Sequence, residues 1–239
     1  MEKLINGIEI TYFGHSTFSI QSPGGKKIII DPWIDTNPSC PENLKDIKSV
    51  DIIAITHGHF DHIGDLIDIC SEYKPKVIAN WEICDWLGTK GIENCMPMNK
   101  GGSQTIDNIK FVMTHAQHSS GIKEDDGTIV YAGEPGGYVI EFENNYHIYH
   151  AGDTNLFSDM KLIAELYKPD LSMLPIGDVF TMSPLEASYA CRYLKSNYVI
   201  PMHYATFPLL TGTPEELIQL TRDIKELEIL QLKPGECLT

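Results

Sequence analysis

The stretch Thr56-His57-Gly58-His59-Phe60-Asp61-His62 places three imidazoles and a carboxylate within six consecutive positions. It follows residues 51–55, whose sequence Asp-Ile-Ile-Ala-Ile predicts a buried strand. In an extended segment His57 and His59 point to one side, and a following turn brings Asp61 and His62 round, so the loop offers two ligand pairs. The spacing therefore predicts a metal site at a strand end, and it favours two metals over one.

The alternative is a chance group of histidines on a surface loop. Four polar groups at this density have no packing role, and burying them unpaired is costly. We therefore expect the segment to bind metal. So short a segment cannot complete two coordination shells, and the remaining ligands must come from elsewhere in the chain.

Three further candidate ligands each follow a strand-like segment. His118 follows residues 109–113, Asp153 follows 146–149 and His203 follows 198–200. Taken alone, an Asp in Gly-Asp-Thr is also typical of a turn or helix N-cap, and a His in Pro-Met-His-Tyr is also typical of a core. Polar side chains that recur at strand ends are what an active site at one rim of a sheet requires. We therefore expect all three to join the cluster.

The order of these motifs resembles a known family. Thr-His-Gly-His-Phe-Asp-His-Ile-Gly at 56–64, then His118, Gly152-Asp153-Thr154 and Met202-His203-Tyr204, is similar to the successive motifs of the metallo-β-lactamase-fold hydrolases over nearly the whole chain. The segments 13–16, 31–32, 118–120, 150–154, 175–182 and 201–204 resemble a branch of metal-dependent hydrolases. That branch is related to ascorbate-6-phosphate lactonase and N-acylphosphatidylethanolamine phospholipase D. The resemblance implies an α/β fold, a four-layer αββα sandwich, whereas periodicity alone gives only mixed α/β.

The resemblance also implies a division of the ligands between two metals. It assigns the first metal to His57, His59 and His118, the second to Asp61, His62 and His203, and the bridging position to Asp153. Secreted antibiotic-hydrolysing lactamases commonly use a Cys for the second metal and lack the bridging Asp. The presence of Asp153 therefore argues against a role in antibiotic resistance.

One ligand position has two candidates. His115 competes with His118, because the sequence spacing alone excludes neither. We expect His118, since Ser119 and Ser120 follow it as in the family motif.

A site that binds two divalent cations in this way indicates a hydrolase. His and carboxylate ligands suit zinc, manganese and iron, and we expect zinc or manganese. Metals about 3.5–4 Å apart can share a water and lower its pKa toward about 7, so we expect a bridging hydroxide that attacks a lactone or a phosphodiester. A metal-binding scaffold or sensor without turnover and a di-iron redox protein on the same fold are the alternatives.

Other polar residues near strand ends are second candidates. Asp31 has the chemistry to accept the second N–H of a ligating imidazole, or it forms an Asp-Pro turn. His15 also has the position to orient a ligand. We group His15 and Asp178 with Asp61 and Asp153 as catalytic candidates, because either could instead contact the substrate or deliver a proton. His150 faces either the site or the core.

The pocket walls are expected from residues next to these motifs. The candidates are Phe180, Met182, Tyr204, Phe207 and the loop 120–137, and ordinary core packing is the alternative for the aromatic residues. The loop is rich in turn-forming residues, which predicts an exposed flap.

The remaining pattern predicts strands first and helices later. Residues 8–13, 16–20 and 27–30 are strand-like, with a turn at 22–25. Ile63, Leu66, Ile67 and Cys70 have helical spacing, so a helix should follow the ligand loop. Ser-Pro-Leu-Glu at 183–186 and Thr-Pro-Glu-Glu at 213–216 each predict a helix start.

Composition predicts a single cytoplasmic domain over residues 1–239, with 42% hydrophobic residues for its core. Residues 1–7 lack the apolar stretch of a signal peptide, and no run reaches the about 20 apolar residues that span a bilayer. The six cysteines include no Cys-x-x-Cys pair, which predicts reduced thiols. A net charge of −15 disfavours generic nucleic-acid binding and leaves a small-molecule substrate.

Overall fold

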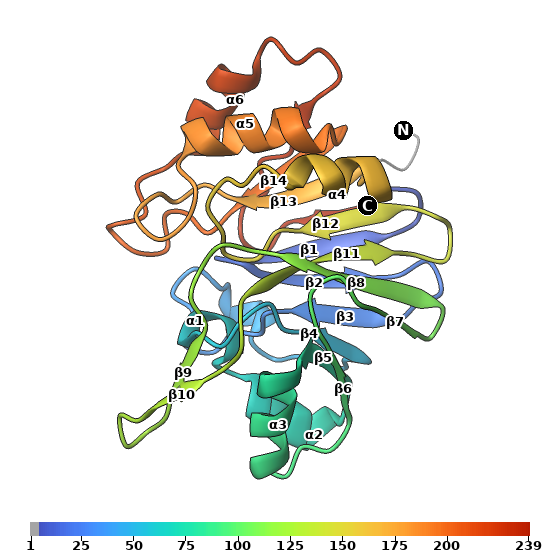
Figure 1. Cartoon of the computed structure of the whole chain (residues 1–239), viewed down its shortest axis with the longest axis vertical. Coiled ribbons are helices and arrows are strands. Elements are labelled where there is room, and N and C mark those ends of the chain that lie inside the picture. Colours follow the sequence, from blue (N-terminus) through green and yellow to red (C-terminus); the bar gives the residue numbers. More distant parts are fainter. Residues whose placement is uncertain (1–4) are drawn as a thin grey trace.

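Two mixed seven-stranded sheets form the centre of the computed structural model, which describes residues 5–239 (Figure 1). The strands of the first sheet are β1 (Glu9–Gly14), β2 (Thr17–Gln21), β3 (Lys27–Ile30), β4 (Ile52–Ala54), β5 (Lys76–Asn80), β6 (Cys95–Met98) and β16 (Cys237–Leu238). The strands of the second are β7 (Ser103–Ile106), β8 (Ile109–His115), β11 (Gly136–Glu141), β12 (His147–His150), β13 (Leu171–Pro175), β14 (Tyr198–Met202) and β15 (Glu228–Ile229).

The two sheets share one pattern of pairing. The first has the order β16-β1-β2-β3-β4-β5-β6, antiparallel up to β3 and parallel from β3 to β6. The second has the order β15-β14-β13-β12-β11-β8-β7, antiparallel from β7 to β12 and parallel from β12 to β15. Parallel strands end at the same edge of a sheet, so the loops that follow them lie together.

Helices cover the outer face of each sheet (Figure 1). The helical segments are α1 (Phe60–Ile63), α2 (Leu66–Tyr73), α3 (Trp81–Thr89), α4 (Met160–Tyr167), α5 (Pro184–Leu194), α6 (Pro214–Thr221) and the 3₁₀ turn Glu42–Leu44. Side chains of α2 and α3 pack on the first sheet, and those of α4, α5 and α6 pack on the second. A third cluster of buried side chains fills the space between the sheets. The predicted four-layer αββα sandwich is confirmed.

Successive side chains of a strand point to opposite faces, so one strand packs against two layers. Ile28 and Ile30 of β3 point into the cluster between the sheets, whereas Ile29 packs on the helical side. Burial on both faces requires continuous apolar runs in the parallel strands, and β3 and β4 have them.

Most predicted elements lie within one residue of their expected bounds. Strands β1, β2 and β3 match the three opening runs, and Gly25 N–H donates to Ser22 O in the predicted turn. The helix after the ligand loop is confirmed, although it divides into α1 and α2 at residues 64–65. Ser183 caps α5 with a full capping box, and Thr213 caps α6.

A small hairpin and six free cysteines complete the description of the fold. Segment 120–137 contains a small hairpin of β9 (Gly121–Lys123) and β10 (Ile129–Tyr131). All six cysteines are free, as expected for reduced thiols. Within residues 5–239 we find no helix of the length and apolarity needed to cross a membrane. The prediction that residues 1–7 form no signal peptide falls partly on residues 1–4, which lie outside the described part of the chain.

Candidate metal centre

Loops from both sheets deliver the candidate ligands to one place. His57 and His59 follow β4, and Asp61 and His62 lie in the first turn of α1. The second sheet contributes the other three, which are His118 after β8, Asp153 after β12 and His203 after β14. All seven therefore come from the strand ends at which the sequence predicts them.

The first group of donor atoms consists of three imidazoles. Nε2 of His57 lies 3.0 Å from Nδ1 of His59, which lies 3.3 Å from Nε2 of His118. In a tetrahedral site with metal–nitrogen bonds of about 2.0–2.1 Å, neighbouring donors are roughly 3.3–3.4 Å apart. These three nitrogens therefore have the spacing of one coordination shell. Burial lowers the pKa of each of the three imidazoles, which keeps their lone pairs free of protons.

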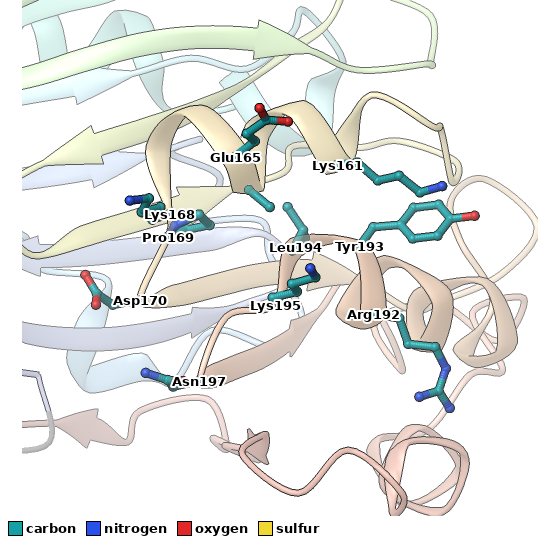
Figure 2. Close-up of a pocket in the computed structure, with 11 residues that line it drawn as sticks. Lys161, Glu165, Lys168, Pro169, Asp170, Arg192, Tyr193, Leu194, Lys195 and Asn197 are labelled. Atoms are coloured by element: carbon teal, nitrogen blue, oxygen red, sulfur yellow. The ribbon is translucent and has the colours of Figure 1, made fainter.

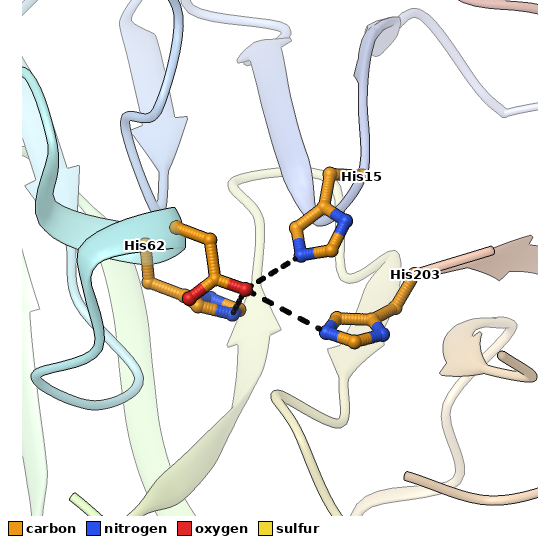
Figure 3. A group of neighbouring side chains, drawn as sticks. His15, His62 and His203 are labelled. Atoms are coloured by element: carbon orange, nitrogen blue, oxygen red, sulfur yellow. Dashed lines mark hydrogen bonds and ion pairs between the residues drawn. The ribbon is translucent and has the colours of Figure 1, made fainter. Parts of the chain in front are cut away.

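The second group is built around Asp61 (Figure 3). Its Oδ2 lies 3.9 Å from Nε2 of His62 and 3.9 Å from Nε2 of His203. His15 also approaches this oxygen, with Nε2 at 2.9 Å. Although burial acts to raise the pKa of Asp61, His62 and His15 lower it to about 2, so Asp61 is ionised. The two groups thus differ in charge, one being neutral and the other containing a carboxylate.

Asp153 lies between the two groups. Its Oδ2 is 2.9 Å from Nε2 of His203 and 3.3 Å from Nε2 of His62 in the second group. The same atom is 3.7 Å from Nε2 of His118 and 4.0 Å from Nε2 of His57 in the first. Burial acts to raise the pKa of Asp153, but His203 and His62 outweigh it and hold the pKa well below its usual range. One ionised oxygen therefore borders both groups.

Polar atoms without partners show that these residues suit metal ions. In the described part of the chain, His62 Nε2 and Asp153 Oδ1 are buried and have no hydrogen-bond partner. Burial acts to lower the pKa of His62, yet the carboxylates of Asp153 and Asp31 raise it well above its usual value. The position therefore calls for a positive charge, which a divalent cation would supply.

Hydrogen bonds on the outer side of the rings fix which nitrogen faces the centre. Asp31 accepts hydrogen bonds from Thr56 N–H, from Thr56 Oγ1 and from Nδ1 of His62 at 2.7 Å. Because the Thr56 hydroxyl donates to Asp31, it accepts from His57 Nδ1 at 3.0 Å. Both rings consequently keep a proton on Nδ1 at the outer side and direct Nε2 to the centre. The expected contact between Asp31 and a candidate ligand is thus present. Thr56 also contributes, and the sequence did not indicate it.

His15 lies behind Asp61 and is fully buried. Its Nε2 contacts Asp61, and its Nδ1 lies 3.0 Å from Oγ1 of Thr206. Burial lowers the pKa of His15 to about 4, so Nε2 carries a proton as a neutral donor. This placement favours a role for His15 in orienting Asp61, because His15 does not belong to the cavity lining, and the role of His15 stays a prediction. Thr206, three residues after His203, was not foreseen.

Strained backbone accompanies several of these side chains. His15 (φ 59°), Asp31 (φ 50°) and His203 (φ 54°) are left-handed, a conformation that costs a side-chain-bearing residue about 1–3 kcal/mol. Asp178 (φ 66°) and Val179 (φ 53°) form a second strained pair before Phe180. Such outliers concentrate at functional sites.

Three other candidates lie away from the cluster. His115 is exposed at the end of β8, where Lys100 Nζ lies 3.2 Å from its Nδ1, so the geometry favours His118. His150 donates to Ser16 O and accepts from Gly152 N, which is the core alternative. Asp178 is exposed, accepts from Val179 N at 2.7 Å, and does not belong to the cavity lining described next, so its catalytic role stays a prediction.

An open cavity of about 700 Å³ adjoins the centre. Its lining includes Phe180 and Phe207, as predicted. Met182 is instead fully buried in the cluster under α5, so its prediction as a wall residue is wrong. Tyr204 packs against the same cluster, which is the core alternative. The other lining residues are His59, Phe60, Asp61, His118, Ser119, Asp153, His203, Pro208 and Leu209. Of these, Phe60 and Leu209 were missed as wall residues, although Phe60 stands within the ligand motif.

Comparison with known proteins agrees with this geometry. A family model described as beta-lactamase superfamily domain matches residues 26–204. A UPF0173 metal-dependent hydrolase of Rubrobacter xylanophilus is 49% identical over 237 residues, 99% of this chain and 98% of that protein. One from Solibacter usitatus is 50% identical over 229 residues, 96% of this chain and 98% of that protein.

A solved structure provides a third likeness. Igni18, a metallo hydrolase from Ignicoccus hospitalis, matches with a TM-score of 0.84 and 37% identity, covering 96% of this chain and 97% of that chain. The chain, with its cluster of His and Asp side chains at the strand ends, belongs to the metal-dependent hydrolases of the metallo-β-lactamase superfamily.

Proposed function

We propose that this protein is a binuclear hydrolase that cleaves an ester-like bond, as in a lactone or a phosphodiester. The observation that supports two metals is the position of Asp153 Oδ2, which lies within 4.0 Å of imidazole nitrogens from both donor groups. A single carboxylate oxygen shared in this way is suited to bridging two cations. His57, His59 and His118 would hold one ion, and Asp61, His62 and His203 the other.

The chain's residues prepare the site for this chemistry. Two divalent cations, when bound, lower the pKa of a shared water toward about 7 and polarise the oxygen of the substrate. Asp31 and Thr56 hold the rings of His62 and His57, while His15 holds Asp61. The cavity wall beside the centre carries apolar side chains on one side.

Metal content and turnover test the proposal together. Metal-loaded wild-type protein should hold two ions per chain and hydrolyse members of a panel of lactones and phosphodiesters. Asp153→Ala should lose bound metal and turnover, while His147→Ala, a half-buried histidine on β12 outside the cluster, should lose neither. A single ion per wild-type chain, or equal activity in Asp153→Ala, would contradict the binuclear site.

The same experiment separates the alternatives. We propose zinc or manganese as the native metal, for which the loaded protein is colourless or nearly so. Two bound ions without any turnover would support a scaffold or sensor. A visible iron absorption band would support a di-iron redox protein.

We further propose that residues 1–239 act as a single domain in the cytoplasm. Six free thiols fit a reducing compartment. Cell fractionation of the intact protein, with its thiols trapped by an alkylating agent, tests this. Recovery in an oxidising compartment with disulfides present would contradict it.

A further inference from the structure

The cavity at the metal centre is walled by apolar side chains. Apart from the polar residues of the centre and Ser119, its lining consists of Phe60, Phe180, Phe207, Pro208 and Leu209. No Lys or Arg belongs to this lining in the described chain. A substrate group lying against the wall therefore meets no partner for a negative charge, and burying such a charge unpaired is costly.

The wall also keeps large apolar side chains in contact with solvent. Phe60 is 63% exposed, Phe180 50% and Leu209 58%. Trp33 supports two of the rings from behind, with centroids 5.8 Å from Phe60 and 5.8 Å from Phe207. Exposed apolar groups gathered around a cavity are typical of a ligand-binding groove. A buried aromatic support makes this surface preformed.

Cationic side chains gather in a different cavity (Figure 2). The cleft between α4 and α5 is lined by Lys161, Lys168, Arg192 and Lys195, together with Glu165 and Asp170. Recognition of a carboxylate or phosphate group usually depends on such Lys or Arg donors. At the metal centre, only the ions themselves would meet a negative charge, and they are engaged with the reacting bond.

We infer that the substrate is an uncharged ester or lactone whose acyl chain or ring packs against Phe60, Phe207 and Leu209. This inference rests on the proposed function, because it concerns the substrate of the same centre. In the reaction the oxygen of water bonds to the carbonyl carbon and the bond from that carbon to the alkoxy oxygen breaks. An ester gives an alcohol, a carboxylate and a proton, and a lactone gives one hydroxycarboxylate and a proton.

A series of 4-nitrophenyl esters tests the inference on metal-loaded protein. From acetate to hexanoate, kcat/KM should rise about three- to fourfold per methylene, as expected for burial of apolar surface. The glutarate monoester has the leaving group and length of the pentanoate ester but ends in a carboxylate. It should react at least about tenfold more slowly, because its charge enters an apolar wall. A flat series, or faster turnover of the glutarate monoester, would overturn the inference.

A pair of lysine variants locates the effect. Leu209→Lys places a cation in the wall and should reduce the preference for pentanoate over glutarate by about tenfold. Leu166→Lys is the control, because Leu166 is 66% exposed on α4 and outside the cavity. Equal preferences in the two variants would overturn the inference.

A binding measurement does not require turnover. Neutral 4-nitrophenyl alkyl ethers cannot be hydrolysed like esters, and the nitrophenyl group should quench the fluorescence of Trp33. Their Kd should fall about three- to fourfold per methylene in wild type and Leu166→Lys, and less steeply in Leu209→Lys. Length-dependent binding without ester hydrolysis would support the apolar ligand and contradict the proposed function. Ester hydrolysis with no length dependence in either assay would support the proposed function and overturn the inference of an apolar ligand.

Discussion

Asp31 Oδ2 lies 2.7 Å from Nδ1 of His62, while Nε2 of the same ring faces Asp153 at 3.3 Å. His62 is thus held between one carboxylate that orients it and one that shares its proposed metal. Asp31→Asn removes the charge that favours the Nδ1–H form of the ring, yet Asn tolerates the left-handed backbone at this position. Outer contacts of this kind are typically worth 10–100-fold in metal affinity.

We therefore expect Asp31→Asn to weaken binding of one of the two ions by about 10–100-fold. Competition with a chromophoric chelator measures this affinity, and circular dichroism checks that the variant is folded. Asp107→Asn is the control, because Asp107 pairs with Lys26 and Lys76 and belongs to none of the candidate ligand groups. Unchanged affinity in Asp31→Asn would show that His62 needs no such support.

The choice between His118 and His115 predicts a contrast between two variants. His118→Ala should lose one of two bound ions and at least about 100-fold in hydrolysis, because it removes one of three donors of the first group. His115→Ala should keep both ions, since that side chain contacts Lys100 and Phe157 instead. Metal analysis of the two purified variants decides the matter, and the opposite pattern would transfer the ligand role to His115.

Gly177 lies close to the backbone of His203, so we expect a larger residue at position 177 to disturb the packing there. A Cβ atom at position 177 would lie 2.1 Å from the carbonyl oxygen of His203, so an added methyl group must push that backbone away. We expect Gly177→Ala to lower the free energy of unfolding by about 1–3 kcal/mol, measured by urea denaturation. It should also weaken metal binding through His203.

Gly88→Ala is the matched control for this substitution. Gly88 lies in α3, and a Cβ atom there meets nothing within 4 Å. It should leave stability unchanged or raise it by about 0.5–1 kcal/mol, the usual gain for Ala over Gly in a helix. Equal effects of the two substitutions would mean that the contact with His203 relaxes freely.

We expect removal of the metal ions to lower the thermal stability of the protein. A ligand that binds only the folded state adds about 2.7 kcal/mol when its free concentration is 100 times its Kd. Chelator-treated protein should therefore melt at a lower Tm, which stoichiometric zinc or manganese restores. Asp153→Asn should show a smaller shift, because the shared oxygen no longer carries its charge. A Tm that is independent of added metal would argue against the centre.

Patterns along the sequence predicted the strands and the cluster, because both follow from local order, whereas the four layers were implied by the family resemblance. Apolar runs such as 51–55 determine burial on two faces, and ligands after strands converge when those strands are parallel. His118 and His115 could not be separated by spacing, since the result depends on where β8 ends and how the chain turns after it.

Other details depended on contacts between segments distant in sequence. Thr206 reaches His15 across 191 positions, and no short motif announces that contact. Met182 and Phe180 are two residues apart, yet one is buried beneath α5 and the other lines the cavity. The strained turn at Asp178 and Val179 comes directly before Phe180, and propensity gives no sign of such a turn.

The candidate ligands come from both sheets, and this predicts a kinetic effect. An ion held by loops after β4 and after β12 would lose some of its ligands whenever the two halves of the molecule moved apart. The rate of metal exchange would then report how often the two sheets move apart. Two donors of the first group, His59 and His118, are partly open to solvent, whereas only Asp61 is in the second, so the first ion should exchange before the other.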